Sequence, residues 1–502
     1  MTIRSLGRHT WHQATYLRLS SNIPVLCILL LVLTAVTALK PVGYIGGGGD
    51  EWQYLASARC WATHGICIPH DHWSARWPLI APMAASIRLF GETRATVELV
   101  PFLYTAAALL LFACLTIRLF GRVEALIAGA ALIATPVFSL GTLKPEVDVV
   151  ELAFLVAAVT AWHAAITRRQ RRWAIATGIA FALAVQTRET SLAYLLVAGI
   201  VFLCSCADDR KLMLWAIPGF AAPVIAESLF LWHLAGDPLL RLHLALHHTQ
   251  LQSSELSAGV DTSRSPLLNP AFIAGWHPSN GIHVCWPIDP ILNLLSHPEI
   301  GMTLLSALLL LASAPSGTRR QTAGRFVLIA TAGATLLIYV LAIDPKPRMF
   351  LPLVTTSSMA IGAMVPISWY IGRRTIAVAV LAILFAQSVC FIAASFSTYR
   401  LEPVAASWIA RDPDAITMDE TTKRVLALVP AIQNLPVNDD SRPLHLTVSG
   451  LGCYGPAGQR STVVRSYKPS NWIIFLFPSP HPSLCLFAHS PRNAGSDARP
   501  IE

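Results

Sequence analysis

The fold of this chain is decided by apolar stretches such as residues 97–117, which read VELVPFLYTAAALLLFACLTI. A helix of this length rises about 30 Å, the thickness of the hydrocarbon core of a membrane. Ten further stretches are long enough, or nearly so, to cross that core. The eleven predicted spans are 23–40, 97–117, 123–140, 148–166, 173–187, 190–206, 212–234, 300–314, 325–343, 349–371 and 375–396. The sequence therefore predicts an all-α polytopic membrane protein.

Composition supports this class of protein. Hydrophobic residues make up 54% of the 502 residues and charged residues 13%, and the mean hydropathy is +0.55. These values exclude a disordered or collagen-like chain and argue against an ordinary soluble protein. The net charge of +9 is explained more simply by membrane topology than by nucleic-acid binding. One ambiguity concerns the polar residues 186–189, which either separate two spans or break one long kinked helix.

Basic residues predict the orientation, because short cytoplasmic loops accumulate Lys and Arg. With the N-terminus in the cytoplasm, every predicted inner loop is basic, and the larger loops 41–96 and 235–299 and the tail from 397 lie outside. A cleaved signal peptide is the alternative reading of the N-terminus, and we favour a retained anchor. The inner basic residues are Arg4, Arg8, Arg18, Arg118, Arg122, Arg168, Arg169, Arg171, Arg172, Arg210, Lys211, Arg319, Arg320, Arg325, Arg373 and Arg374.

The first outer loop carries an acidic pair, Asp50-Glu51, directly after the four glycines 46–49. Glycines let a backbone turn sharply, and a helix dipole favours acids in the first turn of the predicted helix 50–62. Asp50 is either a helix cap or a functional acid. The outer cysteines are candidates for disulfides, Cys60 with Cys67 and Cys453 with Cys485. The sequence does not fix this pairing, which would leave Cys285 without a partner.

Charged residues follow the outer ends of several predicted spans, so the topology brings them to one face. Ionisable residues at membrane depth are costly and by default mark a substrate site. Carboxylates facing cations suggest a nucleophile that is deprotonated near an anionic leaving group. The residues are Asp50, Glu51, Lys144, Glu146, Asp148, Arg188, Glu189, Lys346, Arg348 and the histidines between His233 and His248.

Several motifs occur in a familiar order: GDEWQYL at 49–55, RWPL at 76–79, LFG at 89–91, KPEVD at 144–148, QTR at 186–188 and RMFLP at 348–352. On these motifs the first 400 residues or so resemble the polyprenyl-phosphate-sugar-dependent glycosyltransferases of the GT-C fold. The resemblance is to family 39, which includes protein O-mannosyltransferases and lipid A aminoarabinose transferases. It implies a GT-C bundle of about 11 transmembrane helices, with a large first periplasmic loop, in a bacterial inner membrane.

The resemblance also implies roles for individual residues. Asp50 is expected to act as the general base in an inverting displacement, with Glu51 orienting it. Arg348, Lys346 and Arg188 are expected to bind the phosphate of a polyprenyl-phosphate-linked sugar. The residues expected to bind the acceptor or the sugar are Asp148, Glu146 and Tyr54. The acceptor is expected to be an envelope glycolipid, polysaccharide or protein.

Other interpretations of the sequence remain open. No cofactor is expected to be required, although Glu146 and Asp148 have an acidic spacing that can hold a divalent cation. The histidines are interpreted as interfacial residues rather than zinc ligands. A lipid or anion transporter and a non-catalytic family relative are the alternative functions. Residues 1–400 are expected to form the transferase module, and 401–502 a periplasmic region with a small α/β part at 402–435 and an irregular Pro-rich end.

Overall fold

The computed structural model describes residues 19–39, 50–246, 299–340, 347–399, 401–419, 435–439, 441–449, 461–467 and 483–489, with residues 291, 294, 295, 297, 422, 423, 426 and 432 between them. The chain divides into two compact units. The membrane unit comprises residues 1–40 and 53–392, and the C-terminal unit comprises residues 41–52 and 393–502.

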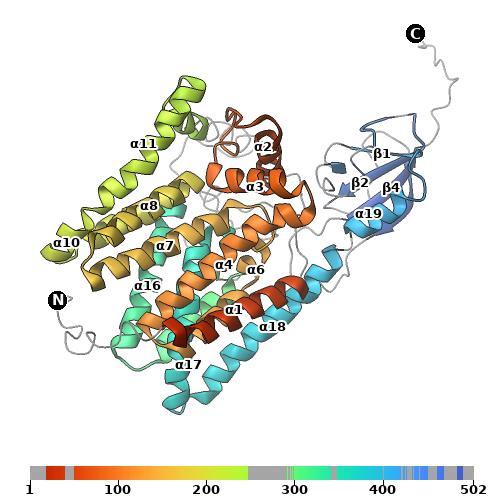
Figure 1. Ribbon diagram of the computed structural model, residues 1–502. Coiled ribbons are helices and arrows are strands. Elements are labelled where there is room, and N and C mark those ends of the chain that lie inside the picture. The colour runs from red at the N-terminus through yellow and green to blue at the C-terminus, as the bar shows by residue number, and fades with distance from the viewer. Residues whose placement is uncertain are drawn as a thin grey trace, which may run out of the picture. The chain divides into compact units, whose positions relative to one another are not determined.

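The membrane unit is a bundle of helices (Figure 1). Its elements are α1 (Leu19–Leu39), α2 (Asp50–His64), α3 (Trp77–Phe90), α4 (Arg94–Leu119), α5 (Arg122–Ala134), α6 (Pro136–Gly141), α7 (Val147–Arg168), α8 (Arg171–Thr187), η2 (Glu189–Ser191), α9 (Leu192–Leu203), α10 (Ala207–Met213), α11 (Ala216–Ala235), α15 (Gly301–Ser313), α16 (Thr318–Thr335), η4 (Leu336–Val340), η5 (Pro347–Phe350), α17 (Leu351–Tyr370) and α18 (Arg374–Tyr399). The first three residues of α2 and the end of α18 belong to the C-terminal unit.

Each of the eleven predicted spans coincides with helix in the structure. Seven described helices are long and apolar enough to cross a membrane. The predicted span 123–140 is broken between α5 and α6, because Pro136 has no N–H to continue the first helix. The predicted spans 173–187, 190–206 and 300–314 form the shorter helices α8, α9 and α15. The protein is a multi-pass membrane protein, and the count of eleven crossings stays a prediction.

The polar break at residues 186–189 separates two antiparallel helices, not the halves of one kinked helix. Ser191, just before α9, donates to Glu151 near the start of α7, while Asp209, just after α9, pairs with Arg169 at the end of α7. Helix α9 therefore runs in the same direction as α7 and antiparallel to α8. The chain reverses at Arg188, whose backbone is extended between α8 and η2.

Glycines allow the closest helix contacts of the membrane unit. Helix α8 packs against both α7 and α11 (Figure 1). A Cβ atom at Gly178 of α8 would overlap the carbonyl oxygen of Ala216, and one at Gly219 of α11 would overlap that of Ile175. Small residues let backbones approach in this way, and dispersion contacts then hold membrane helices together.

The C-terminal unit contains α19 (Leu401–Ile409) and strands β1 (Ile416–Met418), β2 (Leu444–Ser449), β3 (Ser461–Tyr467) and β4 (Ser483–His489). The strand order is β1-β2-β4-β3, with β1 parallel to β2 and the other pairs antiparallel. The predicted confinement of α/β structure to 402–435 was wrong, because three strands lie beyond it. Pro443 directly precedes β2, a position that leaves the hydrogen-bonded ladder intact.

Asp419 follows β1 and organises the loop after it. Its carboxylate accepts hydrogen bonds from the backbone N–H of Thr422 at 2.6 Å and from Oγ1 of Thr447 at 2.5 Å, and His445 lies 3.8 Å away. Burial alone would raise the pKa of Asp419, but the nearby His445 and the hydrogen bonds from Thr447 and Thr422 outweigh it and lower the pKa to about 2.

The structure confirms one predicted disulfide, Cys60–Cys67, which joins the end of α2 to the loop after it. Cys485 is also disulfide-bonded, while its predicted partner Cys453, and Cys285, lie outside the described residues. The five cysteines in or beside spans are free: Cys27, Cys114, Cys204, Cys206 and Cys390.

Candidate functional site

Helix α7 begins in a group of charged residues. Glu146 has extended backbone at the position before the helix, so Asp148 lies in the first turn. The helix dipole favours a carboxylate there. Asp148 is only 4% exposed, and a buried charge requires a partner.

Two arginines from distant parts of the sequence meet Asp148. Arg188 pairs through Nη1 with Oδ1 of Asp148. Arg348 of η5 places Nε 3.8 Å from the other oxygen, Oδ2, and donates from Nη1 to Oε1 of Glu146 at 2.9 Å. Lys144 lies 3.7 Å from the same Glu146 oxygen. Two guanidinium groups thus converge on one buried carboxylate.

Glu151 belongs to this cluster but was not predicted from the sequence. It lies one turn after Asp148 on α7, is 4% exposed and accepts a 2.5 Å hydrogen bond from Oγ of Ser191. Its Oε2 is 3.9 Å from Nη1 of Arg188, so Arg188 is shared by two carboxylates. The sequence does contain a signal for Glu151. A glutamate inside an apolar span, three residues after Asp148, is costly to bury unless it faces a cation.

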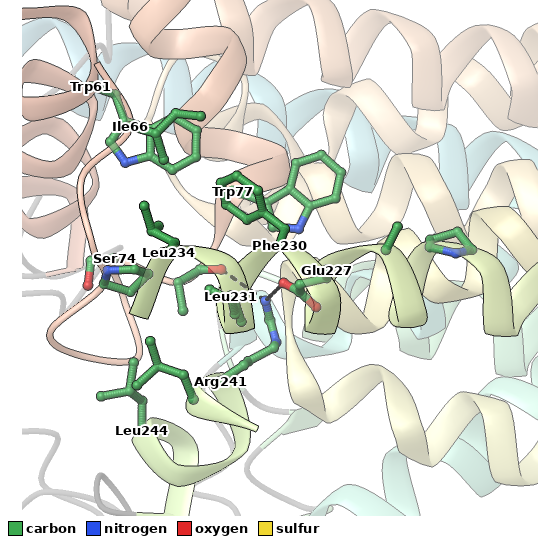
Figure 2. A pocket seen from close by; sticks show the side chains of 15 residues that line it. Trp61, Ile66, Ser74, Trp77, Glu227, Phe230, Leu231, Leu234, Arg241 and Leu244 are labelled. Atoms are coloured by element: carbon green, nitrogen blue, oxygen red, sulfur yellow. Dashed lines mark hydrogen bonds and ion pairs between the residues drawn. The ribbon is translucent and has the colours of Figure 1, made fainter. Parts of the chain in front are cut away.

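A second cluster joins α2, α3, η2 and α11. Nη1 of Arg76 donates to the hydroxyl of Tyr54, and Nη2 lies 3.7 Å from Oε2 of Glu189. Arg241 donates to the other Glu189 oxygen at 2.8 Å and to Glu227 at 3.0 Å. Arg241 and Glu227 were not predicted from the sequence, because each has an ordinary helical or loop context. Only the fold brings them together, in the wall of a pocket of about 330 Å³ (Figure 2).

Among the residues that the structure describes, the two clusters contain equal numbers of cations and anions. Each of the ten groups has an oppositely charged neighbour within 4.0 Å, the limit for an ion pair. An anion that binds to one of these arginines therefore meets a carboxylate that is already in place. The five cations are Lys144, Arg188, Arg348, Arg76 and Arg241, and the five anions are Glu146, Asp148, Glu151, Glu189 and Glu227.

The acidic pair of the first outer loop lies at the start of α2, as predicted. Asp50 is half-buried and Glu51 is buried in the first turn of the helix. Tyr54, one turn further along α2, is fully buried, and its hydroxyl accepts a hydrogen bond from Arg76. The predicted phosphate ligand Lys346 lies outside the described residues.

The histidines of the outer loops have other partners. His243 lies 2.7 Å from Asp237, and His70 lies 3.4 Å from Asp71. Within the part of the chain that the structure describes, no three His, Cys, Asp or Glu side chains are grouped so that they could hold a metal ion.

Comparisons with known proteins agree with this architecture. The family model of dolichyl-phosphate-mannose-protein mannosyltransferases matches residues 78–233, which run from α3 to the end of α11 and include Asp148 and Arg188. No curated protein matches the chain in sequence. The apo structure of ArnT from Cupriavidus metallidurans has a TM-score of 0.50 at 14% identity, over 95% of this chain and 99% of that one.

The Archaeoglobus fulgidus oligosaccharyltransferase has a TM-score of 0.51 at 12% identity, over 86% of this chain and 69% of that one. The chain has the GT-C fold. This confirms the predicted fold class, an all-α membrane bundle followed by a small C-terminal α/β region. The GT-C fold and the family match together support a membrane glycosyltransferase.

Proposed function

We propose that this protein transfers a sugar from a polyprenyl-phosphate donor to an envelope acceptor on the periplasmic side of a bacterial inner membrane. The observation that carries the proposal is the convergence of Arg188 and Arg348 on Asp148. A guanidinium fork matches the oxygens of a phosphate, and it binds more strongly in a site sheltered from water. Two such forks beside one carboxylate form a site that a phosphate can enter by displacing that carboxylate.

The chemistry needs a base and cations rather than a strong acid. A phosphate that leaves the anomeric carbon departs as a stable anion, so Arg348, Arg188 and Lys346 would stabilise it without protonating it. In this proposal Asp50 removes the proton from the acceptor as the acceptor attacks the opposite face of the sugar, which inverts the configuration. Glu51 would orient Asp50.

The carboxylates beside the cations would prepare the site before the donor arrives. Glu146 and Asp148 hold Arg348 in place, and Asp148 and Glu151 hold Arg188. After exchange with the phosphate, Glu146 and Asp148 become available to the sugar hydroxyls or the acceptor, as the resemblance implies. A divalent cation on the same two acids is the alternative occupant.

Native mass spectrometry with a panel of polyprenyl-phosphate sugars tests this proposal. We expect wild type to bind one donor selectively, Arg348→Ala to lose that binding, and Asp50→Asn to keep it. Free polyprenyl phosphate should appear only with wild type after an envelope extract is added. Arg88→Ala is the matched control, because Arg88 is exposed on α3 and should bind the donor normally. Absence of donor binding to wild type would reject the proposal and favour a transporter.

A further inference from the structure

A strongly basic cluster lies at the end of α7 that is far from Asp148. It consists of the turn between α7 and α8, residues 168–172, and the short helix α10, residues 207–211, which packs against both helices (Figure 1). These ten residues include six arginines and lysines and only two aspartates. Arg168 follows Asp148 by 20 residues on α7, so about 30 Å of helix separates them, the thickness of the hydrocarbon core. The basic cluster therefore lies at the opposite membrane surface from Asp148.

Two arginines of the basic cluster lie over one tryptophan ring. The guanidinium carbons of Arg168 and Arg172 are 5.4 and 5.9 Å from the ring centroid of Trp173. The side-chain oxygen of Gln170 accepts from Nε of Arg172 at 3.1 Å and from Nε1 of Trp173 at 3.2 Å. Attraction to the ring holds both cations close together although their charges repel each other. An anion beside the ring would relieve that repulsion.

A third arginine lies over a second ring, which the packing of α10 brings to the turn. The guanidinium carbon of Arg171 is 4.8 Å from the ring centroid of Trp215, just before α11. Arg169 pairs with the buried Asp209 of α10 and so joins α10 to the turn. The backbone of Arg169 has a φ of 53°, in the left-handed region that favours glycine. An arginine at this strained position supplies the ion pair that a glycine could not.

The arginines over the rings differ from those of the two charged clusters near Asp148. Each cation of those clusters has a carboxylate within ion-pair distance, whereas Arg168, Arg171 and Arg172 have none among the described residues and are exposed. A guanidinium that lies over an aromatic ring keeps N–H donors at its edge for an anion. The basic cluster thus presents three pre-arranged cations whose charge no carboxylate of the described chain neutralises.

Apolar surface borders the basic cluster on both sides of α10. Leu203 at the end of α9, and Leu214 and Ile217 around the start of α11, are exposed large hydrophobic residues. Tryptophans such as Trp215 favour the headgroup level of a membrane, where one part of the ring is apolar and the other wet. A ligand that satisfies both surfaces has an anionic headgroup and hydrocarbon chains. Nucleic acids and acidic peptides lack the second part.

We propose that the basic cluster binds the phosphate headgroup of an anionic phospholipid, whose acyl chains lie against the neighbouring apolar surface. Basic pockets between membrane helices are known to bind such headgroups. The bound lipid would neutralise the repelling arginines and hold α8, α10 and α11 together at this end of the bundle. The inference does not depend on the proposed function, because none of its residues belongs to the charged clusters near Asp148.

Native mass spectrometry of the full-length protein, stripped of lipid in detergent, tests the inference. The probes are phosphatidylglycerol and phosphatidylcholine with identical acyl chains, and glycerol 3-phosphate as a headgroup without chains. At about fivefold for each of the three arginines, wild type should bind phosphatidylglycerol roughly a hundredfold more tightly than phosphatidylcholine. An excess of glycerol 3-phosphate should not displace the lipid, because it lacks the acyl chains.

Two double substitutions provide a matched comparison. Arg168→Gln with Arg172→Gln removes both cations over Trp173 and should weaken binding of phosphatidylglycerol by about 25-fold. Arg210→Gln with Lys211→Gln removes the same charge from exposed positions of α10 and should weaken it by about twofold or less. Both variants should unfold at the wild-type temperature without lipid, and phosphatidylglycerol should raise that temperature only in wild type and the α10 variant.

Each alternative result would overturn the inference in a different way. Equal weakening by the two double substitutions would mean that diffuse charge, and not a built site, attracts the lipid. Displacement by glycerol 3-phosphate would assign the arginines to a soluble anion. Loss of polyprenyl phosphate binding in the Arg168 and Arg172 variant would assign them to the donor. If wild type binds phosphatidylglycerol selectively but no polyprenyl phosphate, the proposed function fails while the lipid site stands.

Discussion

Replacement of Arg188 by methionine tests the central charged cluster. The substitution removes the cation shared by Asp148 and Glu151, both buried at the start of α7. Loss of one partner from a buried ion pair typically costs about 3–5 kcal/mol. The cost here should lie near 3 kcal/mol, because Asp148 keeps Arg348 at 3.8 Å and Glu151 keeps its hydrogen bond from Ser191.

Thermal unfolding of the purified protein in detergent measures this effect. The shift per kcal/mol falls as the chain lengthens and is about 1 °C for 502 residues, so the apparent Tm should fall by roughly 3 °C. Glu151→Gln in the Arg188→Met background should recover about half of the loss, since it removes an unpaired buried charge. Arg88→Met, on the exposed surface of α3, is the control and should change the Tm by about 0.5 °C or less. A Tm for Arg188→Met equal to that of Arg88→Met would refute the reasoning.

Three further predictions concern the framework around the site. The double substitution Cys60→Ser and Cys67→Ser should lower the free energy of unfolding in chemical denaturation by about 2.5 kcal/mol, from the loop entropy of a disulfide with sequence separation 7. Gly178→Ala should destabilise by about 1–3 kcal/mol through overlap with α11, whereas Gly199→Ala, with open space around it, should stabilise by roughly 0.5–1 kcal/mol; chemical denaturation that gave both the same sign would contradict this. Because the folded-state pKa of Asp419 is lowered to about 2, its contribution to stability is present above about pH 4 and is lost as the pH falls toward 2. Hydrogen exchange of β2 should accelerate over that range in wild type and not in Asp419→Asn.

The sequence by itself determined the membrane class, the position of every described span and the order of charged residues along the chain. These features depend on local properties: the length of an apolar run, the first turn of a helix after glycine, and the spacing of acids in the motif at 144–148. Because helices form from local hydrogen bonds, their existence can be predicted without knowing their neighbours. The disulfide Cys60–Cys67 was one of the candidate pairings of the outer cysteines, and the structure was needed to select it.

Only the tertiary structure decided which charges meet. Asp148 pairs with Arg188 and Arg348, which lie 40 and 200 residues further along the chain, and nothing local to Asp148 specifies either partner. The same holds for Arg241, whose four hydrogen bonds reach three other segments as well as α11. A buried charge must find a partner, so sequence can predict that partners exist. Their identity is set by helix packing, where glycines such as Gly178 fix how closely two helices approach and therefore which side chains come within reach.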